Sequence, residues 1–213
     1  MRSRLPLARE GYPHIAGALA LSALLFILGW PAAAWLALAM AVFVVGFFRD
    51  PERTIPVDPR AIVSPADGKV VGVKQVQDAR FLDGPATLVS VFMSPLNVHV
   101  NRVPVAARVL DVRYNAGKYF RAFADKASLE NEQNAILLED AHGRRLCFVQ
   151  IAGFLARRIV CYLQSGMDVE RGQRCGMIMF GSRVDIYLPP AAHVCVGLGE
   201  RARGGETVIA EWP

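Results

Sequence analysis

The segment around His99 contains the side chain best suited to proton transfer near neutral pH. It reads SPLNVHVNR and spans residues 94–102. If it forms a β-strand, alternation places Asn97, His99 and Asn101 on one face and the valines between them on the other. An imidazole between two amides suits a general acid or base. A structural histidine held by hydrogen bonds is the alternative.

A carboxylate that could orient such a base stands at Asp67, in the segment SPADGK of residues 64–69. The same residue types also form a tight turn, because Pro65 presets φ, Asp67 bonds to nearby backbone and Gly68 tolerates positive φ. The turn is the simpler interpretation. The segment by itself leaves both open.

The third candidate is the Gly181-Ser182 pair in FGSRVDIYLP, residues 180–189. It lies between two apolar runs that predict β-strands. The pattern G-x-S-x-G of a nucleophile elbow is absent, because Val184 stands where the second glycine is required. The position of the pair, near the C-terminus and between strands, makes it a candidate.

The remaining histidines and the cysteines carry weaker signals. His14 borders an apolar run, His142 precedes a glycine, and His193 follows two prolines and two alanines. The sequence contains no H-E-x-x-H or H-x-H pattern, and its four cysteines form no C-x-x-C pair. We therefore predict no metal site and reduced thiols on a domain that faces the cytosol.

The N-terminal part of the chain is strongly apolar, with no Asp, Glu, Lys or Arg from Ile15 to Phe48. Gly29-Trp30-Pro31 interrupts this run and predicts two helices, at about 13–28 and 32–48. Arginines flank the run on both sides, which favours both ends on the cytoplasmic side of a membrane. Residues 1–48 thus predict a membrane-associated helical hairpin, either re-entrant or with two spans. The run is too long for a cleaved signal peptide.

Residues 49–213 differ from the N-terminal part in their composition and hydrophobic pattern. Short runs rich in β-branched residues follow one another closely and are separated by Gly, Pro, Asn and Asp. This pattern predicts a β-rich (α+β) catalytic domain, barrel-sandwich-like by analogy with lipoyl-type modules, with one short helix at Asp125–Asn131.

Overall composition excludes several classes of protein. The 213 residues are 53% hydrophobic with a net charge of +5, so the chain is not disordered. A nucleic-acid-binding protein would need a Lys/Arg stripe with aromatic residues, and none is present. The modest basic excess fits a surface close to anionic lipid.

The segments SPADGKV, MSPLNVHVNRVP and FGSRVDIYLP, in this order, closely resemble the short bacterial form of phosphatidylserine decarboxylase. The resemblance covers about Arg49 to Pro213, and the hydrophobic N-terminal segment also fits. Members of this family are zymogens that cut themselves at a Gly-Ser bond and convert the serine into a pyruvoyl group. The resemblance therefore implies a cut between Gly181 and Ser182. The products would be a β chain, 1–181, and an α chain, 182–213, held together as a heterodimer.

The resemblance also implies an activity. The pyruvoyl group made from Ser182 would form a Schiff base with phosphatidylserine and release carbon dioxide to give phosphatidylethanolamine, a step of phospholipid biosynthesis. Such a lyase needs no metal and no external cofactor. It would work on the cytoplasmic face of the cell membrane, anchored by the N-terminal hairpin.

Individual roles follow from the resemblance as well. His99, oriented by Asp67, would act as the base in an arrangement similar to Ser-His-Asp. Longer bacterial forms carry a second histidine where Arg102 stands here, so His99 would serve both the cut and the decarboxylation. Arg102, Lys69 and Lys118 are candidates for binding the substrate phosphate.

Two other functions are compatible with the residues alone. One is a non-catalytic, membrane-tethered β module, and the other is a membrane-attached serine hydrolase that keeps its hydroxyl. Denaturing electrophoresis distinguishes them, because only the self-processing decarboxylase would run as two chains.

Overall fold

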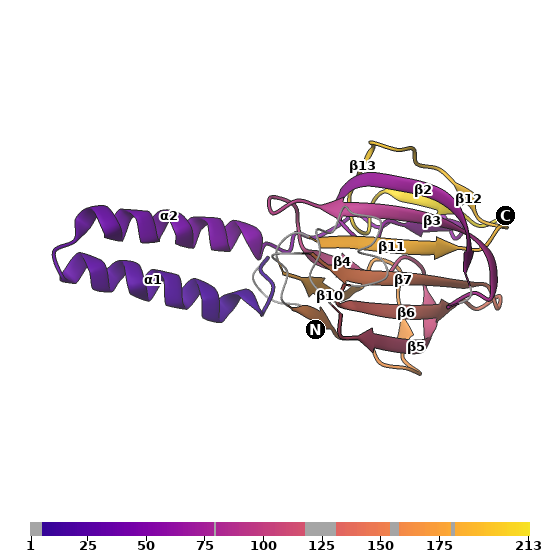
Figure 1. The fold of residues 1–213 in the computed structure, drawn as a ribbon, viewed down its shortest axis with the longest axis horizontal. Helices are drawn as coiled ribbons and strands as arrows, with labels where there is room; N and C mark the ends of the chain where they lie inside the picture. Colours follow the sequence, from indigo (N-terminus) through magenta and orange to yellow (C-terminus); the bar gives the residue numbers. More distant parts are fainter. Residues whose placement is uncertain (1–5, 79, 118–130, 154–157, 180–181) are drawn as a thin grey trace. The chain divides into compact units, whose positions relative to one another are not determined.

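The computed structural model describes residues 6–78, 80–117, 131–153, 158–179 and 182–213. The chain divides into two compact units, Met1–Glu52 and Arg53–Pro213. The first contains two helices and the second is built from β-strands (Figure 1). The expected β-rich class and the two N-terminal helices are confirmed.

The helices of the first unit are α1 (Gly11–Ile27) and α2 (Pro31–Phe47), close to the expected boundaries. Gly29 has a φ of 77°, a left-handed conformation that glycine adopts without strain, and it turns the chain between them. Pro31 opens α2 at the first helical position, where its missing N–H has no cost. The Ser22 hydroxyl donates to the Ala34 carbonyl oxygen at 2.9 Å and joins the two helices.

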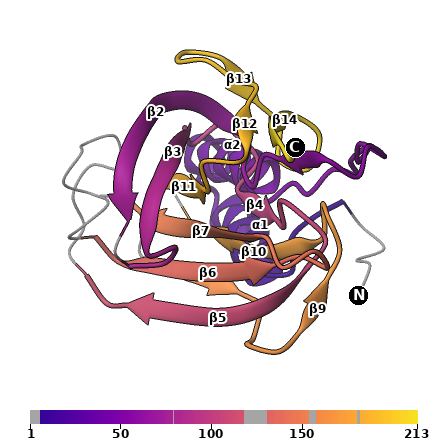
Figure 2. The same ribbon diagram turned by 90° about the vertical axis from the view of Figure 1, so that its right-hand side faces the viewer.

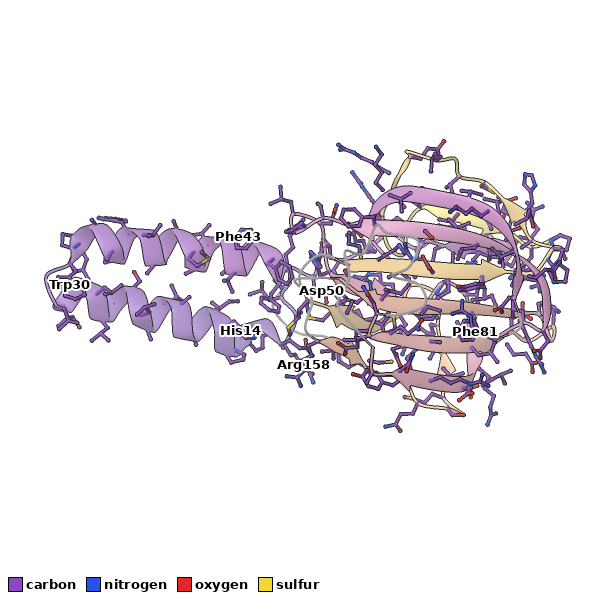
Figure 3. The ribbon with its side chains drawn as sticks, viewed as in Figure 1. His14, Trp30, Phe43, Asp50, Phe81 and Arg158 are labelled. Atoms are coloured by element: carbon purple, nitrogen blue, oxygen red, sulfur yellow. The ribbon has the colours of Figure 1, made fainter. Side chains whose placement is uncertain are left out.

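Neither helix contains a charged residue, and together they expose many large apolar side chains. Trp30 lies in the turn and Phe43 lies on α2 (Figure 3). The others exposed on the helices and their turn are Tyr12, Leu19, Leu21, Leu24, Phe26, Ile27, Leu28, Trp35, Leu36, Met40, Val42 and Val45. Among the described residues, no helix has both the length and the hydropathy needed to cross a membrane.

The second unit contains an eight-stranded sheet in which every pair of neighbours is antiparallel. Its order is β13 (Arg201–Ala202), β2 (Gly68–Asp78), β3 (Gly84–Met93), β11 (Ser182–Leu188), β7 (Arg145–Ala152), β6 (Gln133–Glu139), β5 (Ala107–Asn115) and β9 (Asp168–Val169). Figure 2 shows how strongly the sheet curls from β2 to β5. Because its end strands β13 and β9 do not pair with each other, the sheet is open within the described ranges.

Two three-stranded sheets complete the unit. One has the order β1 (Ala61–Val63), β14 (Val208–Glu211) and β12 (His193–Val194), and the other has the order β4 (Val100–Arg102), β10 (Arg174–Ile178) and β8 (Ile159–Cys161). The short helix expected at 125–131 falls outside the described residues, except for Asn131.

Strand β11 lies at the centre of the large sheet, and both of its faces are buried. Val184 and Ile186 point to the face that packs on the main core, here called the inner face. Tyr187 points to the opposite, outer face, where it packs in a second cluster with Cys147 and Val149. The apolar residues at positions 184 and 186–188 suit a strand covered on both sides, although Arg183 and Asp185 interrupt the apolar run.

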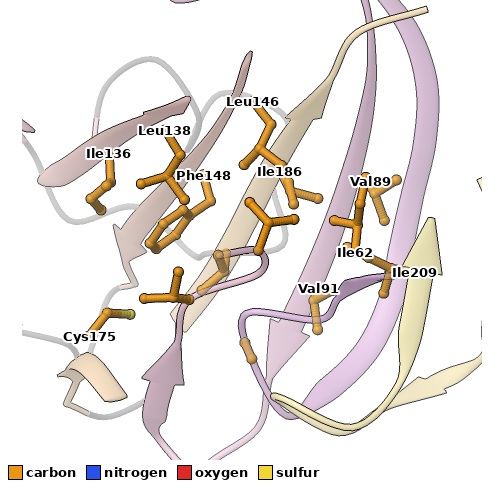
Figure 4. Close-up of a cluster of buried hydrophobic side chains, with 14 of the residues drawn as sticks. Ile62, Val89, Val91, Ile136, Leu138, Leu146, Phe148, Cys175, Ile186 and Ile209 are labelled. Atoms are coloured by element: carbon orange, nitrogen blue, oxygen red, sulfur yellow. The ribbon is translucent and has the colours of Figure 1, made fainter. Parts of the chain in front are cut away.

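The main core fills the inside of the curled sheet (Figure 4). Phe148 and Ile186 from the large sheet, Ile62 from β1 and Ile209 from β14 are fully buried there. Burying such side chains contributes about 2 kcal/mol each, so this core accounts for much of the stability of the domain. Cys175 of β10 also packs here, and burial raises the pKa of its thiol well above the ordinary value.

Candidate active site at the start of β11

The three candidate segments meet at one end of the large sheet, on the neighbouring strands β2, β3 and β11. Phe92 on β3 pairs with Lys69 on one side and with Arg183 on the other. The next residue of β3, Met93, pairs with Ser182. The strand order therefore brings three segments to the same end of the sheet. They are the Asp67 segment, the start of the His99 segment and Ser182.

Two backbone hydrogen bonds tie the His99 segment to the other two. The N–H of Arg102 donates to the carbonyl oxygen of Pro65 at 2.9 Å, which links it to the Asp67 segment. The N–H of Ile178 donates to the carbonyl oxygen of His99 at 3.3 Å, which links it to the chain just before the Gly-Ser pair. Gly181 itself lies outside the described residues.

Ser182 is the first residue of β11, and its side chain is completely buried on the inner face. Its hydroxyl lies 3.8 Å from the Met93 sulfur. A thioether sulfur is a weak hydrogen-bond acceptor and does not act as a base toward the hydroxyl. The paired residue on β7 is Ala152, which leaves room on that side. The serine is therefore held in a dry and largely neutral environment.

His99 is also fully buried, and its Nδ1 lies 2.9 Å from the carbonyl oxygen of Asn97. A carbonyl oxygen can only accept a hydrogen bond, so Nδ1 carries a proton and the neutral ring has its lone pair on Nε2. The tautomer suited to a base that acts through Nε2 is thus set by the backbone of the same segment.

The expected alternation through this segment is wrong at its beginning. Strand β4 starts only at Val100, because a turn from Ser94 to Asn97 occupies the preceding residues. The Asn97 side-chain oxygen accepts from the N–H of Ser94 at 2.9 Å and from its hydroxyl at 2.7 Å. This turn fixes the backbone whose carbonyl oxygen holds the imidazole.

Asp67 is held by two groups that the sequence did not suggest as its partners. The Nη2 of Arg53 donates to its carboxylate oxygens at 3.0 and 2.8 Å, and the N–H of Gly204 donates to Oδ1 at 2.7 Å. Both side chains are mostly buried, and Arg53 also lies 3.5 Å from Glu206. In the sequence Arg53 is simply one of the arginines that follow the apolar run, and only the fold brings it to Asp67.

Gly68, directly after Asp67, allows β2 and β3 to come close together. A Cβ at this position would lie 2.1 Å from the carbonyl oxygen of Phe92. The glycine of the SPADGK segment is thus required by the close approach of the strand that leads to Met93. The segment thus bends the chain and holds the Asp67 carboxylate through Arg53 and Gly204, whereas the expected orientation of His99 by Asp67 stays a prediction.

Of the three candidate phosphate ligands, the described ones, Arg102 and Lys69, lie on strands of different sheets. Arg102 is buried, and its Nη1 donates to the carbonyl oxygen of Gly172 at 3.0 Å. Lys69 is exposed on β2, in a different sheet. Lys118 lies outside the described residues.

A buried ion pair lies on the outer face, directly behind the serine. Arg183 and Asp185 are two residues apart on β11 and therefore share that face. Their Nε and Oδ1 atoms are 2.9 Å apart and their Nη2 and Oδ2 atoms 3.1 Å apart. This pair is not among the residues expected from the sequence, although opposite charges at positions i and i+2 of an apolar strand indicate an ion pair on one face of the sheet.

Comparison with known proteins gives a consistent result. The family model described as phosphatidylserine decarboxylase matches residues 40–210. A phosphatidylserine decarboxylase proenzyme of Syntrophotalea carbinolica is 49% identical over 205 residues, covering 96% of this chain and 95% of the relative. Proteins with the same name are 48% identical in Ralstonia nicotianae, covering 96% and 95%, and 47% identical in Neisseria meningitidis, covering 97% and 77%.

The turn that holds the His99 ring should contribute measurably to stability. We expect Asn97→Ala to lower the free energy of unfolding by about 1–2 kcal/mol, because two hydrogen bonds to its side-chain oxygen are lost. Asn97→Asp keeps an acceptor oxygen for both hydrogen bonds and serves as the matched control, with a change within about 0.5 kcal/mol. Urea titration of the detergent-solubilised protein measures both. An alanine variant as stable as the wild type would show that the turn does not depend on this side chain.

Proposed function

The chain belongs to the phosphatidylserine decarboxylase family, and from that premise we propose that it cuts itself between Gly181 and Ser182 and then converts phosphatidylserine into phosphatidylethanolamine. The family membership agrees with the resemblance of the three segments. The observation that carries the proposal is the meeting of these segments at the start of β11, with a buried serine and a buried histidine.

A pyruvoyl group at position 182 would supply the carbonyl that binds the substrate amine and withdraws electrons as carbon dioxide leaves. The residues around Ser182 fit such a group. It is about as large as a serine side chain, and its neighbours on the paired strands, Met93 and Ala152, are buried and uncharged. No metal or external cofactor enters this proposal.

For the cut, we assign His99 as the base and Ser182 as the nucleophile. The Ser182 hydroxyl gives its proton to Nε2 while Oγ bonds to the carbonyl carbon of Gly181. The C–N bond then breaks, the nitrogen takes up a proton, and an ester replaces the amide with no atom lost. Removal of the Ser182 α-proton expels the Gly181 carboxylate, and hydrolysis by water releases ammonia and leaves the pyruvoyl group.

We assign Asp67 a supporting part in the same arrangement. Its carboxylate, held by Arg53 and Gly204, fixes the segment whose Pro65 carbonyl oxygen accepts from Arg102. In turnover, His99 would return a proton to the substrate carbon that has lost carbon dioxide. Lys69 is exposed and is therefore our candidate for the headgroup phosphate, whereas Arg102 is buried and its Nη1 donates to the carbonyl oxygen of Gly172.

The two products of the cut should remain together as a heterodimer. Strand β11 begins the α chain and lies between β3 and β7 of the β chain. Strands β13 and β14 of the α chain also pair with β2 and β1. Separating the chains would therefore break the sheet on both sides of β11.

We further propose that residues 1–48 anchor the enzyme at the cytoplasmic face of the membrane. The support is the uncharged run from Ile15 to Phe48 and the exposed apolar side chains of both helices. Each helix of 17 residues is about 25 Å long, comparable with the hydrocarbon thickness of roughly 30 Å. An anchor of this kind keeps the substrate headgroup accessible while the acyl chains stay in lipid.

Processing gives the most direct test of this function. We expect the wild-type protein to run as two chains on denaturing electrophoresis and to decarboxylate phosphatidylserine. Ser182→Ala should remain one chain without activity, since it lacks the attacking oxygen, and Ser182→Cys should cut slowly. Ser165→Ala, in an exposed turn, is the matched control and should be processed normally. A Ser182→Ala protein that still yields two chains would refute the assigned cleavage site.

The roles of His99 and Asp67 can be separated by time courses of cutting. We expect His99→Ala to slow the cut by at least about 10²-fold, the usual contribution of a general base, and His142→Ala to leave it unchanged. Asp67→Asn should slow it less, and Arg53→Met should resemble Asp67→Asn if anchoring of the carboxylate is what matters. Normal maturation of His99→Ala with loss of turnover alone would restrict His99 to protonating the substrate.

Membrane association depends on the apolar surface of the helices. We expect the full chain to bind vesicles of phosphatidylcholine and phosphatidylserine and to stay bound in about 1 M salt, because apolar burial is not screened. Ile27→Lys or Leu36→Lys, at positions that are 81% and 72% exposed, should weaken binding by about 10²-fold. Val57→Lys, at a 95% exposed position of the second unit, is the control. Equal binding of all variants would disprove the anchor.

A further inference from the structure

Three amide side chains form a buried chain on the inner face of the domain. The Nδ2 of Asn134 on β6 donates to Oε1 of Gln150 on β7 at 3.1 Å. The Nε2 of Gln150 donates to Oδ1 of Asn101 on β4 at 2.9 Å. Asn101 and Gln150 are fully buried and Asn134 is 3% exposed. Three polar groups at such depth require a structural or functional reason, since each is costly to bury.

The direction of this chain is fixed by a backbone group. Besides Asn101, Nε2 of Gln150 approaches the carbonyl oxygen of Val160 at 3.5 Å. A carbonyl oxygen can only accept, so the nitrogen of Gln150 must be the atom on that side. Consequently Asn101 turns its oxygen toward Gln150, and its NH₂ group points the other way.

The NH₂ group of Asn101, at one end of this series of hydrogen-bonded amides, faces the region around Ser182. Nδ2 of Asn101 lies 3.6 Å from the Met93 sulfur, the same atom that lies 3.8 Å from Oγ of Ser182. A thioether is a weak acceptor, so neither donor is strongly committed to it. The Asn101 N–H donor and the buried Ser182 hydroxyl thus approach the same weak acceptor, on the inner face where β11 begins.

We propose that Asn101 is a catalytic residue of the self-cleavage, an inference that rests on the proposed function. When Oγ of Ser182 bonds to the carbonyl carbon of Gly181, the π electron pair of that carbonyl moves to its oxygen, and the hydroxyl proton goes to His99. Nδ2 of Asn101 donates to this oxygen and stabilises its negative charge until the C–N bond breaks and the charge is neutralised. A preoriented donor in a dry site is effective because no solvent must reorganise.

Gln150 and Asn134 are positioning residues in this arrangement. They hold the Asn101 amide in the orientation that presents nitrogen rather than oxygen to the serine. Because all three amides are neutral, they fix a donor without placing a charge near His99 or Ser182. The three hydrogen-bonded amides also come from β6, β7 and β4. They therefore connect the large sheet to the small sheet that carries the end of the His99 segment.

The test follows cutting of the full-length chain after cell-free synthesis with phosphatidylserine vesicles present. We expect Asn101→Ala to slow the cut by about 10²-fold, the usual effect of losing one donor to an oxyanion. Gln150→Glu should slow it to a similar extent, because Asn101 must then donate to the carboxylate and turn its oxygen toward Ser182. Gln133→Glu, the same change at a buried amide on the outer face of β6, is the control and should cut normally.

Hydroxylamine distinguishes a role in the first step from a general loss of structure. It cleaves the Ser182 ester but not an amide, and releases a 182–213 chain that begins with serine. We expect the slow variants to remain folded, as judged by their thermal unfolding, and to stay uncut in hydroxylamine because no ester has formed.

Three results would overturn the inference. Cutting of Asn101→Ala at the wild-type rate would show that its donor is not used. Accumulation of a hydroxylamine-sensitive ester in that variant would place Asn101 after the first step. Equal slowing by Gln133→Glu would show that any buried charge in β6 or β7 has this effect. A wild-type chain that folds but is never cut would instead refute the proposed function, and the role of Asn101 with it.

Discussion

The position of β11 between β3 and β7 is the constraint on which the rest of the site depends. The strand is paired along its whole length with β3 and along most of it with β7. Because side chains alternate, a shift of one residue would move Ser182 to the outer face and bring Arg183 into the core. The ion pair of Arg183 and Asp185 opposes that shift, because the shift would bring both charged side chains into the apolar main core.

This register explains how a bond can be broken within the fold without loss of the fold. The proposed cut falls at the first residue of β11, at the edge of its pairing with both neighbours. The backbone hydrogen bonds of the strand lie after the cut, and the core residues Val184, Ile186 and Leu188 remain in place. Cleavage releases a strand end and leaves the sheet intact. The energetic consequences of processing are therefore local, whereas those of a change in register would involve the whole domain.

Much of this arrangement could be predicted from the sequence, because the relevant signals are local. The uncharged run with its Gly-Trp-Pro break gave two helices, and the short β-branched runs gave a β-rich domain. The three motif segments identified the family. Local alternation failed at Asn97, where the turn with Ser94 delays the start of β4. That turn is held by two hydrogen bonds to the Asn97 side-chain oxygen, and such local side-chain bonds compete with strand formation.

The partners of the motif residues could not be predicted, because they are distant in sequence and ordinary in type. Arg53 meets Asp67 across 14 positions, and Gln150 meets Asn101 across 49. Nothing in an isolated Gln or Arg shows that it will be buried; only the strand order places these side chains. The tautomer of His99 is similarly hidden, since it depends on a backbone carbonyl oxygen that every residue possesses.

The two faces of β11 differ in their polar groups, and this difference has a chemical consequence. The outer face behind the serine holds the charged pair of Arg183 and Asp185, whereas the inner face beside it holds neutral groups: a hydroxyl, a thioether and amides. A fixed charge on the inner face would favour one protonation state of a nearby imidazole through several steps of the reaction. A base that must accept a proton and later return one works best where neither state is strongly favoured. Neutral amides can orient the reacting groups through hydrogen bonds without adding a fixed charge beside Ser182, which would suit a histidine with the two tasks proposed for His99.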